Sequence, residues 1–352
     1  MGYRYIGSKE KLANTIIDLI RQEVPDAETI IDLMAGTGNF SLALRRKGFR
    51  VTASDVMTYS LHHLRVNLLL DAPPSFNGLV GLIPGLQTDS TDNYPKVLDY
   101  LNSLQGIRGY FYTEFSPEGQ PADASKPRMY YTAENAKKID AIRAKIKEWH
   151  EAGRTDAIEH SLLLHTLILD SNDIANIAGT YGHYLSHFVQ RACTPIELKP
   201  CAIENNDNIG HRVLCGYAET LAETLTADVC YIDPPYIKRQ YAANYHILET
   251  LAREDNPEAI GESGLRPWRD RYSNFCSKLK IRDSFTQIIN NIHARHIFIS
   301  YSEDGLLPIE ELQKFLAIFG AIKIHRIRYK RFKSNNSKKD PYLTEYLIYI
   351  QK

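Results

Sequence analysis

Hydrophobic positions along the chain alternate between two spacings, one typical of buried strands and one typical of amphipathic helices. Short apolar runs that end at Gly, Asp or Ser predict strands near residues 30, 51, 213, 230 and 298. Helical spacing predicts helices over 10–21, around 42–44, and over 61–70, 133–151, 156–169, 247–253 and 308–319. Near the end, two strand-like segments, 322–329 and 343–350, predict a hairpin.

The order of these segments indicates the fold class. Strands that alternate with helices form a doubly wound α/β sheet, in which loops at the carboxyl ends of the strands build the site. We therefore expect an α/β fold with a Rossmann-like sheet, closed by the C-terminal antiparallel hairpin. Residues 71–200 interrupt the alternation with Pro- and Gly-rich stretches followed by helices, so they predict an inserted, mainly helical domain.

Charge and cysteine content narrow the function classes. The 352 residues carry 42 basic and 42 acidic side chains, so the chain as a whole does not attract a polyanion, and nucleic-acid binding would depend on local basic patches. The five cysteines form no C-x-x-C pair, which argues against a disulfide framework and against a zinc site, and we expect no metal. No run of about 18 apolar residues is present, so we expect a cytoplasmic protein without a membrane partner.

A glycine turn follows the first predicted strand. Gly36 and Gly38 lie where the chain turns from strand to helix, and they allow the backbone to pass close to a ligand. The turn lacks the third glycine of a dinucleotide fingerprint and the Gly-Lys-Ser/Thr of a phosphate loop, so neither NAD nor ATP fits it well. About 20 residues later the second strand ends at Asp55, an acid that can accept both hydroxyls of a ribose. Together these features predict a cofactor that contains adenosine.

Asp233-Pro234-Pro235-Tyr236 follows the apolar run at 229–232 and is the main candidate for chemistry. Each proline lacks an N–H and fixes its own φ, so the turn does not relax into a helix. The Asp233 carboxylate and the Pro234 carbonyl can then accept both hydrogens of an exocyclic amine while Tyr236 stacks on its ring. A plain proline turn after a strand is the competing interpretation, since Asp-Pro is common in turns.

Four polar or basic segments are candidates for nucleic-acid contact. They are the loop 179–184 with Tyr181 and His183, the segment 237–246, the basic aromatic stretch that contains Arg266, Trp268, Arg269 and Arg271, and the hairpin connection from Lys330 to Lys339. Solvated charges and aromatic turns packed on a helix are the alternative interpretations of each segment.

Taken together, these motifs resemble the Dam-like, restriction–modification type DNA adenine-N6 methyltransferases. The resemblance rests on six segments in the order of that family: 4–9, 32–38, Asp55, 233–236 with 239–241 and 244–246, 333–335, and 345–347. It implies a Rossmann-like methyltransferase sheet, S-adenosylmethionine as cofactor, and N6-methyladenine as product. It also implies that residues 1–70 and 201–352 form the catalytic, cofactor-binding domain and that 71–200 form the target-recognition domain.

The resemblance assigns roles residue by residue. The catalytic residues would be Asp233, Pro234 and Tyr236. Cofactor-binding residues would be Tyr5, Lys9, Asp32, Ala35, Gly36, Gly38, Asp55, Tyr217 and Asp233. DNA-binding residues would be Tyr181, His183, Lys238, Arg239, Tyr241, Asn244, Lys330, Arg331 and Lys333. The partner would be double-stranded DNA, with the target adenine turned out of the helix, and a cognate restriction endonuclease acting on the same site is the further partner of such a system.

One position departs from the family pattern. Where relatives carry an acid before the aromatic residue, this chain has Gly216 before Tyr217, so either Glu219 or a backbone group would contact the adenine of the cofactor. Two alternatives for the function stay open: the same transfer to cytosine N4 or to adenine in RNA, and a nucleic-acid-binding module without catalysis. Cytosine enzymes more often begin the turn with Ser, and RNA or protein-glutamine enzymes with Asn, so Asp233 favours adenine in DNA. Gly36, Gly38, Asp55 and Asp233 argue against the module.

Overall fold

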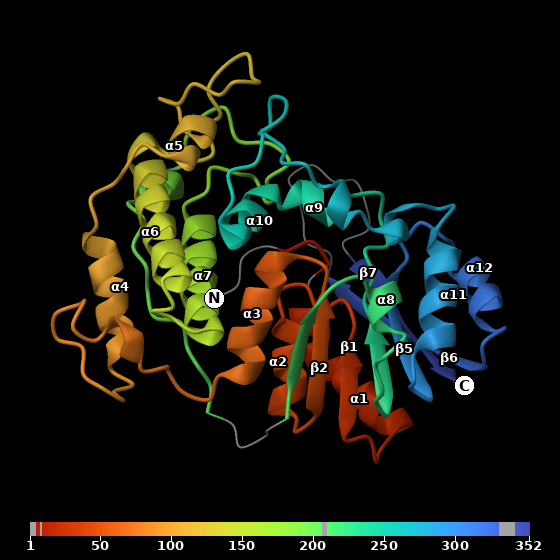
Figure 1. Ribbon diagram of the computed structural model, residues 1–352. Helices are drawn as coiled ribbons and strands as arrows, with labels where there is room; N and C mark the ends of the chain where they lie inside the picture. The colour runs from red at the N-terminus through yellow and green to blue at the C-terminus, as the bar shows by residue number, and fades with distance from the viewer. Residues whose placement is uncertain (1–4, 8, 206–209, 331–341) are drawn as a thin grey trace. The chain divides into compact units, whose positions relative to one another are not determined.

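Seven strands form one mixed sheet in the order β3-β2-β1-β4-β5-β7-β6 (Figure 1). The computed structural model describes residues 5–7, 9–205, 210–330 and 342–352. The strands are β1 (Thr29–Asp32), β2 (Arg50–Asp55), β3 (Arg212–Cys215), β4 (Val229–Ile232), β5 (His296–Ser302), β6 (Ala321–Lys330) and β7 (Tyr342–Gln351). The first five pair in parallel, while β7 is antiparallel to both β5 and β6. The predicted α/β class and the C-terminal antiparallel hairpin are thus confirmed.

Residue alternation gives the sheet two different faces. Ile31 of β1 is paired with Cys230, Cys230 with Ile297, and Ile297 with Ile350, and all four side chains are fully buried in one apolar core. The next residue along each of these strands points to the opposite face, because side chains alternate along a strand. That face is also buried, and it places Asp32 beside the aromatic residues Tyr231 and Phe298.

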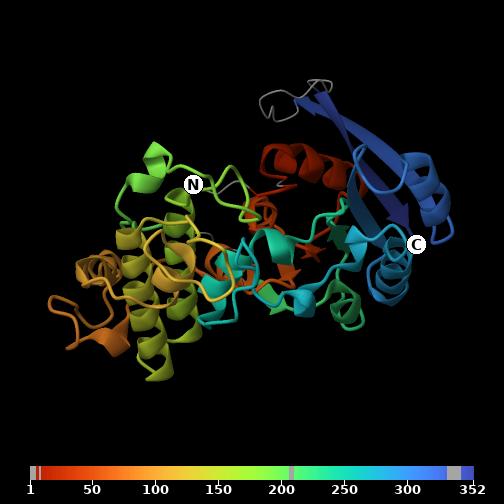
Figure 2. The same ribbon diagram turned by 90° about the horizontal axis from the view of Figure 1, so that it is seen from above.

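Helices cover both faces of the sheet. Helices α8 (Ala218–Leu221), α11 (Ile281–Asn291) and α12 (Ile309–Leu316) supply the side chains that fill the Ile31 face. Helices α1 (Ala13–Glu23) and α2 (Asn39–Arg46) lie on the other side of the strands from α11 (Figure 2). There the ring of Phe40 lies 4.2 Å from that of Tyr231. This arrangement is the doubly wound one that the sequence predicts.

Two compact units divide the chain. The first comprises Met1–Ser8, Met57–Asp207 and Tyr241–Tyr272, and the second comprises Lys9–Val56, Asn208–Gln240 and Ser273–Lys352, which contain the whole sheet. Helices of the first unit are α3 (Thr58–Leu69), α4 (Asn93–Ser103), α5 (Tyr110–Phe115), α6 (Ala133–Glu151), α7 (Ala157–Asp173), α9 (Tyr241–Asn244) and α10 (His246–Arg253). Residues 71–200, all of them described, contain helices and no strand.

Buried polar contacts join α3 to α7 within the first unit. His63 and His165 face each other with their Nδ1 atoms 2.8 Å apart, and the Nδ1 atom of His62 lies 3.1 Å from the Ser161 hydroxyl. Burial lowers the pKa of His62 to about 3 and that of His165 to about 4, so both imidazoles stay neutral near pH 7. These neutral hydrogen bonds thus join two helices that lie side by side.

The observed helices differ from the predicted ones in several places. Helices α4, α5, α8 and α11 were not predicted, although Ile281, Phe285 and Ile288 have helical spacing and are buried. The segment 237–246 was interpreted as a loop, but it contains the single turn α9. Pro, Gly and charged residues in and around these segments obscured the helical spacing of their apolar residues. None of the helices in the described part of the chain is both long and apolar enough to cross a membrane.

Candidate active site at the carboxyl edge of the sheet

Asp233 follows the last residue of β4 and lies at the carboxyl edge of the sheet. Strand β4 is fully buried, Pro234 is buried beside it, and 17% of the Asp233 side chain is exposed. Burial raises the pKa of the Asp233 carboxyl, and the neighbouring Lys9 ammonium opposes that rise. The carboxylate is therefore largely shielded from water. In such surroundings its hydrogen bonds to an amine are stronger than they would be in water.

Lys9 reaches the same place from the start of the second unit. Its ammonium donates to Asp233 Oδ1 at 2.7 Å, and its Nζ atom lies 3.1 Å from Glu345 Oε1 and 3.5 Å from the Tyr236 hydroxyl. Lys9 is only 5% exposed. Burial lowers the pKa of Lys9, but Asp233, Tyr236 and Glu345 outweigh this effect and hold the pKa well above its usual value. The site thus contains a protonated amine paired with two acids.

Glu345 was quoted from the sequence as part of the hairpin but was given no role. It lies on β7 opposite Ser302, the last residue of β5, so the antiparallel register brings it to the carboxyl edge. It is 1% exposed, and the Tyr236 hydroxyl donates to its Oε1 atom at 3.4 Å. A carboxylate inside the largely apolar segment 343–350 was the signal available in the sequence. Its position opposite the end of β5 depends on the hairpin register, which spacing alone does not give.

The glycine turn and the second acid lie at the same edge of the sheet. Gly36 and Gly38 have φ values of 55° and 77°, a region that favours glycine. The Gly36 N–H donates to Asp55 Oδ2 at 2.8 Å, and the Ala35 N–H donates to the Ser54 carbonyl at 2.9 Å. The predicted set of Ala35, Gly36, Gly38 and Asp55 is therefore one connected structure.

Asp32 lies beneath this turn. It is 1% exposed, and its Oδ2 atom accepts a hydrogen bond from the Ser41 hydroxyl at 2.5 Å. Its Oδ1 atom is buried and has no hydrogen-bond partner among the described residues. Burial raises the pKa of Asp32 to about 7, against the effect of the Ser41 bond. A buried carboxylate oxygen without a partner is costly, so its presence beneath this turn requires an explanation.

Gly216, which stands where the expected pattern has an acid, lies beside Asp55. The Gly216 N–H donates to the Asp55 carbonyl at 3.0 Å and continues the strand pairing. Glu219 accepts a hydrogen bond from the Ser284 hydroxyl of α11 at 2.7 Å, so its carboxylate is engaged there. Tyr217 is 37% exposed. Of the two predicted replacements for the missing acid, a backbone group agrees better with these contacts than Glu219 does.

Tyr5 belongs to the first unit, where it lies in a cluster of tyrosines. Its ring stacks on that of Tyr245 at 4.7 Å, and its hydroxyl lies 3.0 Å from that of Tyr59. The Tyr241 hydroxyl donates to the Ile6 carbonyl at 2.6 Å. The cluster fixes the N-terminal segment on α9 and α10, and a cofactor contact from Tyr5 stays a prediction.

The residues predicted to bind DNA differ in accessibility. His183, Lys238 and Arg239 are exposed. Tyr181 is fully buried and its hydroxyl donates to Asn172 Oδ1 at 2.9 Å, so its side chain is not exposed for contact with DNA. Tyr241 and Asn244 are partly buried on α9. Arg331, Lys333 and the side chain of Lys330 lie outside the part of the chain that is described.

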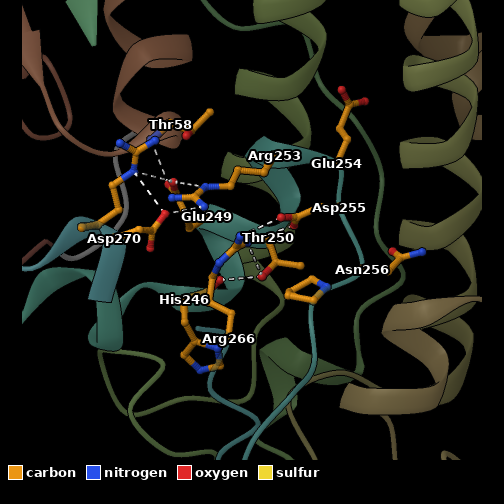
Figure 3. Close-up of polar contacts among 12 residues, drawn as sticks. Thr58, His246, Glu249, Thr250, Arg253, Glu254, Asp255, Asn256, Arg266 and Asp270 are labelled. Carbon is orange, nitrogen blue, oxygen red and sulfur yellow. Dashed lines mark hydrogen bonds and ion pairs between the residues drawn. The ribbon is translucent and has the colours of Figure 1, made fainter. Parts of the chain in front are cut away.

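Arg266 was interpreted as part of a phosphate-contacting stretch, and this was wrong. It is 4% exposed and pairs with Asp255, with Nη2 2.7 Å from Oδ2, while Nη1 donates to the Thr250 hydroxyl at 3.1 Å (Figure 3). Its guanidinium therefore links α10 to the segment that follows it. Arg269, by contrast, is exposed.

Comparisons with known proteins agree with this geometry. Residues 5–315 match a family model described as the D12 class N6 adenine-specific DNA methyltransferase. The chain is 34% identical to the type II methyltransferase M.FokI of Planomicrobium okeanokoites and 31% identical to the modification methylase StsI of Streptococcus sanguinis, covering 99% of this chain and 52% of each relative. It is 30% identical to the type II methyltransferase M.NlaIII of Neisseria lactamica, with 99% of both chains covered. The chain thus spans about half the length of the first two relatives and almost all of the third.

Proposed function

We propose, because the chain belongs to the D12 class of N6 adenine-specific DNA methyltransferases, that it transfers a methyl group from S-adenosylmethionine to N6 of adenine in DNA. The observation that carries the proposal is the hydrogen bond between Asp233 and the Lys9 ammonium, 2.7 Å long. The carboxylate at the end of β4 already binds an amine. The amino group of adenine is the amine that the family chemistry would bring to the same acceptor.

The residues present fit the proposed cofactor. Gly36 and Gly38 leave the turn without side chains, and Asp55, fixed by the Gly36 N–H, would accept the ribose hydroxyls. Asp32 lies buried at the same edge, where its Oδ2 atom accepts from the Ser41 hydroxyl. When bound, S-adenosylmethionine supplies a methyl group on a positively charged sulfur.

The roles of the chain in the transfer follow from the nature of the nucleophile. The lone pair of N6 is delocalised into the ring, so it attacks poorly until the nitrogen becomes tetrahedral. Asp233 and the Pro234 carbonyl would accept the two N6–H groups and orient the lone pair towards the methyl carbon, and the Tyr236 ring would hold the base. As the nitrogen–carbon bond formed, the sulfur–carbon bond would break and leave the sulfur neutral, and the extra proton on N6 would pass to water.

DNA contact is the second part of the proposal. N6 is paired inside a duplex, so the adenine would leave the stack, which costs a few kcal/mol and is offset by stacking of roughly 1–3 kcal/mol and by phosphate contacts. We assign phosphate or base contacts to His183, Lys238, Arg239, Tyr241 and Asn244, and target recognition to residues 71–200. Methylation at a defined site would protect DNA from an endonuclease that cuts the same site.

The test measures transfer of labelled methyl groups to duplex DNA, followed by sequencing of the N6-methyladenine positions. Asp233→Ala should lose methylation and keep S-adenosylmethionine binding, measured by calorimetry. Glu311→Ala is the control, since Glu311 is an exposed carboxylate of the same unit that pairs with Arg282. Normal turnover by Asp233→Ala would refute the assignment. Methyl transfer to cytosine or to RNA in place of adenine in DNA would favour the alternative substrates, and absence of cofactor binding would favour a non-catalytic module.

A further inference from the structure

Glu345 has one oxygen that is paired and one that is not. Its Oε1 atom lies 3.1 Å from Lys9 Nζ and accepts from the Tyr236 hydroxyl at 3.4 Å. Its Oε2 atom is buried and has no hydrogen-bond partner among the described residues. A buried carboxylate oxygen without a partner is costly, so its retention in the centre of the sheet edge requires an explanation.

The position of Lys9 shows what the second oxygen can do. The Lys9 ammonium holds Asp233 Oδ1 at 2.7 Å, which is the acceptor that the proposed chemistry requires for the adenine amine. An amino group that donates to the same oxygen would compete with Lys9 for it. Lys9 is 5% exposed, and moving a buried ammonium away from all acceptors costs several kcal/mol. Another acceptor within the site is needed.

We propose that Glu345 is a positioning residue that takes over the Lys9 ammonium when the substrate amine binds Asp233. Lys9 would lie between the two carboxylates before the base arrives and on both oxygens of Glu345 afterwards. The exchange keeps the ammonium paired throughout and frees Asp233 Oδ1 for the amine. This inference rests on the proposed function, because the incoming amine is the adenine N6.

The surroundings of Glu345 make it suited to this role. Asp233 and Glu345, the two ion-pair partners of Lys9, are both carboxylates, so the ammonium would move between partners of equal charge. The Tyr236 hydroxyl lies within 3.5 Å of Lys9 Nζ and 3.4 Å of Glu345 Oε1, so it can bond to the site in either arrangement. Glu345 itself is fixed by strand pairing on both sides, with Ser302 and with Ile327. Lys9, by contrast, has a flexible side chain of four methylenes.

The test is the variant Glu345→Gln, which keeps the volume of the side chain and removes its charge. Lys9 would then pair with Asp233 alone and compete with the substrate amine. We expect kcat to fall at least about tenfold, equivalent to about 1.4 kcal/mol, while the Kd of S-adenosylmethionine changes less than about twofold. Glu23→Gln is the matched control, because Glu23 Oε1 also pairs with a lysine of the same unit, Lys323 Nζ at 2.5 Å. It should leave kcat unchanged.

A double-mutant cycle with Lys9→Met tests whether Glu345 acts through Lys9. In the Lys9→Met background, Glu345→Gln should lower kcat much less than it does in the wild type. An equal loss in both backgrounds, or a wild-type kcat for Glu345→Gln alone, overturns the proposal. If Lys9→Met leaves too little turnover to measure, the same cycle in the free energy of unfolding decides, and absence of coupling between the two residues overturns it. A wild-type chain that binds the cofactor and methylates no DNA refutes the proposed function separately.

Discussion

Removing Glu249 should destabilise the first unit more than removing any exposed acid. Glu249 lies on α10 and is 1% exposed. Its Oε2 atom accepts hydrogen bonds from the N–H groups of Thr58 at 2.9 Å and Tyr59 at 3.3 Å, the first two residues of α3, and its Oε1 atom accepts from Arg253 Nε at 2.7 Å (Figure 3). One carboxylate therefore stabilises the start of α3 and an arginine of its own helix.

The size of the loss follows from these contacts. In Glu249→Ala two largely buried N–H groups lose their acceptor, which costs about 2 kcal/mol. Arg253 keeps a second partner, with Nη1 2.9 Å from Asp270 Oδ2, and is partly exposed, so its loss adds only about 1 kcal/mol. We expect a total of about 3 kcal/mol, equivalent to a Tm lower by about 6–12 °C in a unit of this size.

Thermal unfolding followed by circular dichroism measures the total loss of stability. Hydrogen exchange of the peptide that contains Thr58 and Tyr59 shows whether the loss occurs at the start of α3. The two amides should exchange faster in Glu249→Ala than in the wild type. Asp270→Asn is the control: it removes the exposed partner of Arg253 and should cost less than about 1 kcal/mol. A loss below about 1 kcal/mol in Glu249→Ala, or unchanged exchange at Thr58 and Tyr59, would refute the reasoning.

Three further outcomes are expected. Asp55→Ala removes the acceptor of the Gly36 N–H and of the proposed ribose, so the Kd of S-adenosylmethionine should rise about tenfold or more in calorimetry, and an unchanged Kd would contradict this. Gly264→Ala should lower the free energy of unfolding by about 1–3 kcal/mol in urea, because φ is +65° and the new Cβ would lie 2.9 Å from Arg128 Cδ; an unchanged midpoint would argue against it. Burial raises the pKa of Glu345 from 4.5 to about 7, so the wild type loses stability as the pH rises through that window and Glu345→Gln does not. The stability difference should therefore move in favour of the Gln variant by up to about 3 kcal/mol between pH 4 and pH 8, and a constant difference would count against a raised pKa.

Local patterns in the sequence were sufficient for the parallel part of the sheet. Apolar runs such as 229–232 are buried strands, and the acid or glycine that ends each one lies at the carboxyl edge because parallel strands place their ends together. The pairing of Lys9 with Asp233 and Glu345 was not predictable in this way. It joins three segments far apart in the sequence, and one of them arrives on an antiparallel strand whose register is set by the hairpin.

Burial was the other property that could not be predicted from residue type. Tyr181 and Arg266 were assigned to nucleic acid because aromatic and basic side chains bind it, yet both are buried with hydrogen-bond partners inside the first unit. A guanidinium paired with a carboxylate and a tyrosine hydroxyl bonded to an amide satisfy the same donors that a phosphate or a base would. Whether these side chains bind nucleic acid or bond inside the unit is decided by how α10 and its neighbours pack.

Two buried acids at the sheet edge, Asp32 and Glu345, lower the stability of the fold when they are ionised. This cost supports their assignment to function. Burial raises the pKa of Asp32 and of Glu345 to about 7, so keeping either ionised above that pH lowers the free energy of unfolding. Each also has an oxygen without a hydrogen bond among the described residues. A sequence selected for stability alone would place an amide or an apolar residue there, because neutral replacements of buried charges are often more stable. Acids with strongly raised pKa values are common at sites that bind and transform a ligand. Here two of them lie near Asp233, the residue on which the proposed methyl transfer depends.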